Sequence, residues 1–215
     1  MLRNHQLDCH LVVFTSNRQL PVADSQLLQT IEMPEFLELF YPFDKTPTES
    51  AVSKPFLAKL GEQEAELEFS SFNASDALAL GLAILAESPK AKAPDAPGVR
   101  AVVVHVSING NLQFYCAQDG TNADNYGWIQ RKVNTVTRFG RASIFMGSSC
   151  MAVGKDFNEK FLLPETEYVG VGGGFPLRVK GVAYPVGVVA VSGLPHQMDH
   201  ELVTKGIKKY LESKK

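Results

Sequence analysis

The sequence lacks a long apolar run, a close cysteine pair and an excess of charge of either sign, and each lack excludes a class of protein. No apolar run approaches the roughly 18 residues that a membrane-spanning helix needs. The three cysteines, Cys9, Cys116 and Cys150, lie far apart, which argues against a zinc ribbon or a disulfide framework. Because 21 Lys and Arg stand against 23 Asp and Glu, the net charge of −2 predicts no nucleic-acid or membrane-surface partner.

The N-terminus also lacks the pattern of a secretory signal. Its one apolar stretch is residues 11–14, and Asp8 precedes it. A signal peptide needs a longer apolar core and a cleavage site of small residues. We therefore expect a cytoplasmic protein with no membrane insertion.

Common enzyme fingerprints are missing as well. The glycine-rich segment 170–174 departs from the dinucleotide pattern, because Phe175 takes its sixth position and Pro176 opens a strand. It carries no Gly-Lys-Ser/Thr of a Walker loop, and residues 147–150 do not fit a Gly-x-Ser-x-Gly elbow. The sequence thus favours a protein that is not an enzyme.

What is present is the composition of a folded protein, with 45% hydrophobic and 20% charged residues. Residues 1–60 show little regular pattern and include a Pro-punctuated stretch at 41–55, and a second such stretch at 88–98 predicts a loop. We expect a partly irregular N-terminal extension, 1–60, followed by an α+β domain, 61–215.

The hydrophobic pattern from residue 66 onward predicts five strands and three helices. The strands are expected at 66–69, 99–108, 112–117, 175–179 and 186–191, and the helices at 73–87, 124–139 and 198–212. Asn109-Gly110 between two β-rich runs indicates a hairpin, and Gly140 ends the second helix. The order β-α-β-β-α-β-β-α predicts an α+β fold, with a five-stranded antiparallel sheet and helices packed on one face.

The hydrophobic pattern of one expected strand points to self-association. The strand at 186–191 is apolar on both faces, so both faces must be covered. Three helices on one face leave the other to a second subunit or to the N-terminal segment, which predicts a homo-oligomer. We also expect His105 to be neutral and hydrogen-bonded inside an interface, and Trp128 to lie in the core or at a subunit contact.

A set of motifs in the C-terminal two thirds carries a resemblance to a known family. They are W-I-Q-R-K at 128–132, R-F-G at 138–140, G-G-x-P at 173–176, G-V-x-x-V-S-G-L-P at 187–195 and D-H-x-L-V at 199–203. In combination they resemble the haem-degrading-domain family, also called GlcG/HbpS-like, over roughly residues 66–211. The nearest branch is that of uncharacterised cytosolic bacterial and fungal proteins.

The resemblance implies more about structure than about activity. It implies an α+β domain with a five-stranded antiparallel sheet, assembled into rings or larger homo-oligomers. It implies haem as a possible cofactor, and it implies no settled reaction for this branch.

Three groups of residues are candidates for a site, and each has a structural alternative. The first is the glycine turn, where Gly173, Gly174 and Phe175 let backbone N–H groups approach an anion. The alternative is a tight turn packed against a neighbouring element.

The second candidate is the start of the last helix. His196 and His200 are four residues apart, so on one helix they share a face and offer two nitrogens to a haem iron. Asp199 and His200 also form a candidate catalytic pair for acid–base chemistry. No third ligand lies nearby in the sequence, so no other metal site is predicted. The alternative is a structural role, with Asp199 stabilising the helix N-terminus.

The third candidate is a basic face on the helix at 124–139. Arg131 and Arg138 are seven residues apart and lie on one side of it, with Arg141 just beyond and Lys132 adjacent. Arg178 can join them. Such guanidinium groups clamp a carboxylate, a phosphate or a haem propionate. The alternative is a solvated face or a set of intersubunit ion pairs.

The residues therefore support three interpretations. The first is a homo-oligomer that binds a small anionic or planar ligand, for which the resemblance names haem as the candidate. The second is an enzyme that degrades haem or performs other acid–base chemistry with His200 and Asp199. The third is a non-catalytic assembly module that displays sites for protein partners.

Overall fold

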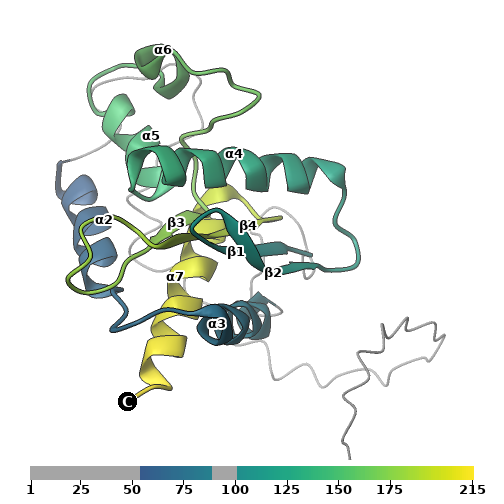
Figure 1. The fold of residues 1–215 in the computed structure, drawn as a ribbon. Helices are drawn as coiled ribbons and strands as arrows, with labels where there is room; N and C mark the ends of the chain where they lie inside the picture. The colour runs from purple at the N-terminus through teal and green to yellow at the C-terminus, as the bar shows by residue number, and fades with distance from the viewer. Residues whose placement is uncertain (1–53, 89–100) are drawn as a thin grey trace, which may run out of the picture. The chain divides into compact units, whose positions relative to one another are not determined.

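The computed structural model describes residues 54–88 and 101–215, which all belong to one unit of the chain, residues 35–215 (Figure 1). Its helices are α2 (Lys54–Glu66), α3 (Ala74–Glu87), α4 (Ala123–Phe139), α5 (Ser143–Met151), α6 (Phe157–Phe161) and α7 (His196–Glu212). Its strands are β1 (Val103–Ile108), β2 (Asn111–Ala117), β3 (Gly174–Leu177) and β4 (Gly187–Ser192). Most of the expected N-terminal extension lies outside the described residues, and the expected boundary at residue 61 falls within α2.

The strands form one antiparallel sheet in the order β2-β1-β4-β3. The predicted hairpin is confirmed, since β1 and β2 are joined by Asn109 and Gly110 with φ of 48° and 78°. Two left-handed residues in a two-residue loop make a type I′ turn, whose twist matches that of the flanking strands.

The predicted strand at 66–69 is wrong, so the sheet has four strands rather than five. Within the described ranges, only Phe69 pairs there, as an isolated parallel bridge to Val179. The Phe69 N–H donates to the Arg178 carbonyl at 2.8 Å, and the Lys180 N–H donates to the Phe69 carbonyl at 2.9 Å. Because α2 runs to Glu66 and Asn73 already caps α3, the chain is too short between them to extend the pairing.

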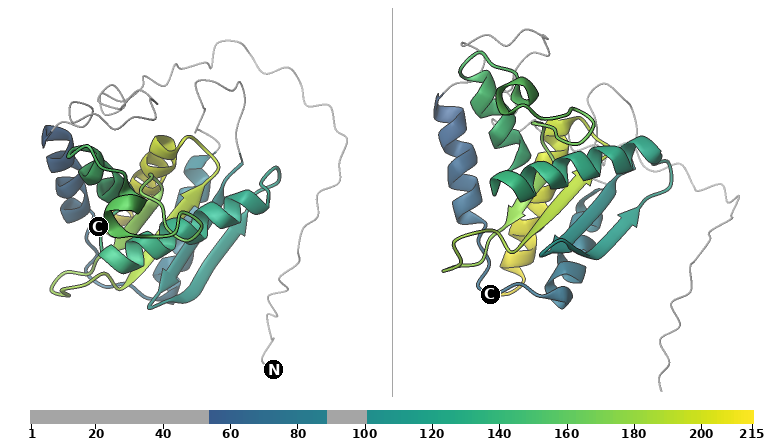
Figure 2. Two further views of the ribbon diagram at one scale, coloured as in Figure 1. Left: turned by 90° about the horizontal axis from the view of Figure 1, so that it is seen from above. Right: turned by 45° about the horizontal axis from the view of Figure 1, so that its top comes forward.

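The prediction that the helices pack on one face is also wrong, because helices cover both faces of the sheet (Figures 1 and 2). α3 and α7 pack on the face that carries Val104, Val106 and Val189. α4 packs on the opposite face, where Ile129 meets Ala190. Both faces of β4 are thus buried within one chain, and the apolar pattern of that strand does not itself require a second subunit.

The three predicted helices are confirmed, and their ends follow local signals. Asn73 caps α3 through a capping box with Asp76, and Asn122 caps α4 in the same way. Gly140 ends α4 in the left-handed region, with φ of 63°. The helices α2, α5 and α6 were not predicted. Across residues 54–88 and 101–215, no helix is both long and apolar enough to cross a membrane. The cytoplasmic location stays a prediction.

Candidate functional site

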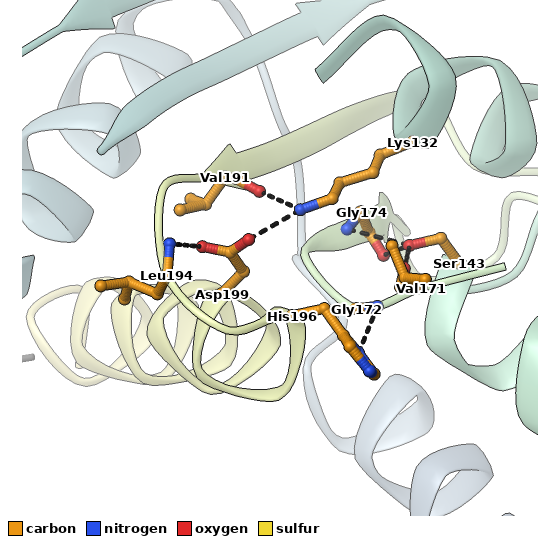
Figure 3. A network of polar contacts seen from close by, with 9 residues as sticks. All are labelled: Lys132, Ser143, Val171, Gly172, Gly174, Val191, Leu194, His196 and Asp199. Atoms are coloured by element: carbon orange, nitrogen blue, oxygen red, sulfur yellow. Dashed lines mark hydrogen bonds and ion pairs between the residues drawn. The ribbon is translucent and has the colours of Figure 1, made fainter. Parts of the chain in front are cut away.

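A buried ion pair lies where α4, the end of β4 and the start of α7 meet (Figure 3). Lys132 Nζ lies 2.8 Å from Asp199 Oδ2 and donates a second hydrogen bond, also 2.8 Å, to the Val191 carbonyl. Asp199 Oδ1 accepts the Leu194 N–H at 3.0 Å. Both charged side chains are only 2% exposed. Burial raises the pKa of the Asp199 carboxyl, and the Lys132 ammonium opposes that rise.

The glycine turn packs directly against this ion pair. Gly173 has φ of +110°, and a Cβ there would lie 2.6 Å from Lys132 Nζ and 2.5 Å from the Val191 carbonyl oxygen. The Gly174 N–H donates to Ser143 Oγ at 3.0 Å (Figure 3). The backbone groups of this turn therefore face side chains of the protein itself, as in the packed-turn alternative.

His196 and His200 both lie on α7, which begins at His196, so they share a helix face as their spacing predicts. His196 Nδ1 accepts the Gly172 N–H at 3.1 Å, and burial, with Lys132 nearby, lowers its pKa to about 4. His200 Nε2 lies 2.8 Å from Gln63 Oε1, and burial lowers its pKa to about 3. Both imidazoles are neutral at pH 7. His200 Nδ1 is buried and meets no hydrogen-bond partner among the residues that the structure describes.

The residues predicted to be catalytic or to bind iron make contacts that are typical of structural residues. Asp199 holds the loop from β4 to α7 in place through Lys132 and Leu194. The His200 side chain is 1% exposed, and its ring centroid lies 5.9 Å from that of Phe175, which is itself in the main core. Within the described ranges, no three His, Cys, Asp or Glu side chains gather as a metal site would require.

The predicted arginine clamp divides into two pairs. Arg141 Nε binds Glu64 Oε2 at 2.7 Å, and Arg178 donates to the Gly140 carbonyl and lies 3.8 Å from Glu64 Oε2. The Arg131 guanidinium instead lies 3.8 Å from the Trp128 ring centroid. That of Arg138 lies 5.7 Å from the ring centroids of Phe139 and Tyr168. Among the residues that the structure describes, no carboxylate lies within ion-pair distance of Arg131 or Arg138.

A groove of about 380 Å³ runs between the sheet and the side of α4. Its polar lining comes from His105, Ser107, Asn109, Gln130, Asn134, Thr137 and Tyr184, and its apolar lining includes Val133, Val136, Val186 and Val188. Burial lowers the pKa of His105 to about 4, so the lining carries no charge at pH 7. His105 is buried and neutral as predicted, but the predicted hydrogen bond is not seen at its Nε2, which has no partner in residues 54–88 and 101–215.

Comparison with known proteins places the chain in a family. The profile described as "Haem degrading protein HbpS-like" matches residues 72–208. A UPF0303 protein of Streptomyces coelicolor is 37% identical over 162 residues, covering 75% of this chain and 98% of the relative. The chain belongs to the HbpS-like family. The resemblance stated from the motifs is therefore confirmed.

Solved structures agree with this HbpS-like assignment. The crystal structure of Ybr137w protein is 32% identical, with a TM-score of 0.65, and the alignment covers 76% of this chain and 92% of that one. The PduOC:Heme complex is 18% identical, with a TM-score of 0.52 over 64% of this chain and 94% of that one. At that identity the second likeness shows a common fold and no more.

Sequence reasoning missed three parts of this HbpS-like chain: the role of Lys132, the anchoring of the glycine turn by Ser143, and the groove beside α4. One signal was available for Lys132, which lies three residues after Ile129 and four before Val136, on the apolar stripe of α4. A lysine on such a stripe needs a buried partner. The partner is 67 residues away, so the spacing along the sequence did not reveal it.

Proposed function

We propose that this HbpS-like chain binds a small planar ligand that carries carboxylates, and that Arg131 and Arg138 hold those carboxylates. The difference between the two arginine pairs carries the proposal. Arg141 and Arg178 are engaged by Glu64, whereas Arg131 and Arg138 meet no described carboxylate. A guanidinium group in that state can bind both oxygens of a ligand carboxylate.

We propose that the ring system of the ligand lies in the groove beside α4. Its lining is uncharged and partly apolar, which suits a flat ring system rather than an ion. Arg131 and Arg138 directly follow Gln130 and Thr137, which line the groove. The two arginines thus follow lining residues in the sequence of the same helix, and we propose that their long side chains reach the carboxylates of a ligand that extends past the groove's rim.

Haem is the candidate ligand, because the family is described as haem-degrading and one structure with this fold is a haem complex. His196 and His200 do not fit as iron ligands, since one accepts the Gly172 N–H and the other is buried against Gln63. We therefore propose a porphyrin held through its carboxylates and its ring, and not through these histidines. We leave Gly173, Gly174, Phe175 and Arg178 out of this site, because protein groups already pack against them.

The test is a titration with haemin and, separately, with metal-free protoporphyrin IX. We expect both to saturate near one per chain, with dissociation constants within about tenfold of each other. An Arg131→Ala/Arg138→Ala double variant should weaken both by about tenfold or more, since two charge-assisted contacts are lost. A Lys155→Ala/Lys180→Ala double variant removes two exposed cations elsewhere and should bind as the parent does.

Two results would contradict this proposal. The first is absorbance that never saturates, or an arginine variant that binds as tightly as the lysine control. The second is saturation by haemin alone with a Soret shift that His200→Ala abolishes, because iron ligation by that histidine would then hold the ligand. We propose no reaction at Asp199 and His200, since the first is ion-paired and the second is fully buried.

We also propose that the chain self-associates. Exposed aromatic side chains at Tyr126 and Trp128 support this, because such residues are enriched at protein interfaces. Light scattering on the purified full chain should give a mass that is a multiple of 23.5 kDa. A monomer at about 100 µM would contradict it.

A further inference from the structure

The exposed apolar side chains of this protein gather around one edge of the sheet. Of the ten large hydrophobic side chains that are exposed in the described residues, six lie on α3, β2 and the first turns of α4. They are Leu78, Leu82, Leu112, Tyr115, Tyr126 and Trp128, called here the β2-edge surface. The Tyr115 and Tyr126 ring centroids are 6.4 Å apart, and Phe114 of β2 packs on Gly81 of α3. Exposed apolar side chains thus flank β2 on both sides of the sheet, those of α3 on one side and Tyr115 with Tyr126 on the other.

β2 is also an edge strand with little to prevent further pairing. It ends the order β2-β1-β4-β3, and its seven residues, NLQFYCA, include no charge and no proline. Natural edge strands are usually protected by such residues or by a bulge. The single register shift in the β1–β2 pair leaves Gln113 as the extra residue. Residues 114–117 therefore form a regular stretch whose outer edge pairs with no other strand of the described residues.

We propose that β2 pairs antiparallel with β2 of a second copy of this chain, over residues 114–117, and joins the two sheets into one. This names the surface used in the self-association proposed above and rests on it. An edge that meets itself across a twofold axis satisfies the free backbone groups of both strands. The β2-edge surface on each copy then covers the matching side chains of the other.

Charge favours a second copy as the occupant. β2 carries no charge, so pairing two copies along this strand brings no like-charged side chains of β2 opposite each other. The two acidic residues of α3 are already engaged within the chain, Asp76 by Tyr210 and Lys214 and Glu87 by Lys209. The α3 side of the surface is therefore neutral and apolar, as a self-complementary contact requires.

The first test measures mass by light scattering for the full chain, Tyr115→Lys and Leu82→Lys. Each variant should reduce the mass of the assembly at least twofold. Leu162→Lys is the matched control, because Leu162 is the most exposed of these side chains at 90% and lies outside the surface. If the parent assembles and neither lysine variant reduces its mass, this inference is wrong while self-association stands. A monomeric parent overturns both.

The second test needs no variant and so does not depend on one that folds. Amide hydrogen exchange of residues 114–117 in the parent protein should slow as concentration rises through the assembly range, because the proposed pairing protects those amides. Exchange that is equally fast at all concentrations overturns the inference. Strong protection in a monomer also overturns it, because the chain's own residues would then cover the edge.

Discussion

The two sides of α4 differ in how completely the protein uses its polar groups. On the side that faces α7, Lys132 and Asp199 bind each other and nearby backbone groups, and the glycine turn packs closely against them. Elsewhere on α4, Arg131 and Arg138 lack carboxylate partners among the described residues, and Gln130, Val133 and Thr137 line an uncharged groove.

This difference shows that a family motif need not mark a binding site. The motifs that carry the resemblance include G-G-x-P and D-H-x-L-V, and their residues hold β3, β4 and α7 together. The W-I-Q-R-K motif divides within itself, because Lys132 points into the ion pair while Arg131 stacks on Trp128. Binding is better sought where polar and aromatic groups remain open.

The largest expected effect on stability is that of Lys132→Ala, which breaks the buried ion pair and leaves Asp199 without a counter-ion. The free energy of unfolding should fall by about 3–5 kcal/mol. Urea unfolding followed by circular dichroism measures it. A Lys132→Ala/Asp199→Leu double variant should regain part of the lost stability, because it leaves no unpaired buried charge. If Lys132→Ala alone is as stable as the parent, the ion pair does not stabilise the fold.

Gly173→Ala should have the next largest effect, about 2–3 kcal/mol. The added methyl group would clash with Lys132 Nζ and the Val191 carbonyl, and an alanine at φ of +110° also has a strained backbone. Gly181→Ala is the matched control, since Gly181 has φ of +78° and nothing within 4 Å of the added carbon. Its loss should be only about 1 kcal/mol, and equal losses in the two variants would mean that the turn has room for a side chain.

Acidification should lower the free energy of unfolding, because His196 and His200 are neutral in the folded protein. The unfolded chain protonates them near pH 6.5, whereas the pKa is about 4 for His196 and about 3 for His200 in the folded protein. The folded state thus binds fewer protons, so stability is full above pH 6.5 and declines as the pH falls from there toward the folded values. Asp199 acts in the opposite direction, since burial raises its pKa.

His200→Gln isolates the contribution of one of these histidines. The stability difference between the parent and His200→Gln should shift by about 2 kcal/mol between pH 7 and pH 5, in favour of the variant, because glutamine does not titrate. Urea unfolding at both pH values measures the shift. A constant difference would show that His200 is protonated equally in the folded and unfolded states.

The sequence predicted those parts of the fold that depend on neighbours in the chain. Asn109-Gly110 gave the hairpin and Gly140 ended α4, since both act within one turn. The strand at 66–69 was wrong because the alternation of Leu67 and Phe69 comes from a loop that buries both side chains, not from a strand. Which face of the sheet α4 covers depends on how the helices pack against the sheet, and the local sequence pattern does not predict it.

The candidate site divides in the same way. The shared helix face of His196 and His200 followed from their spacing, whereas their neutral, buried state depends on the glycine turn and on Gln63. The separation of Arg141 and Arg178 from Arg131 and Arg138 depends on Glu64 of α2, a helix that the sequence did not predict. Contacts over such distances along the chain are made only by the folded structure.

The smallest expected effect on stability is at Arg131, the residue next to Lys132 in the sequence. Arg131→Ala removes a partly exposed side chain whose guanidinium lies over Trp128, so the free energy of unfolding should change by about 0.5 kcal/mol or less. The same variant should weaken porphyrin binding several-fold, while Lys132→Ala should act on stability far more strongly. Urea unfolding and the haemin titration on one protein sample measure both quantities. A large loss of stability in Arg131→Ala would mean that this side of α4 supports the fold as well, and the proposed division between the two sides would fail.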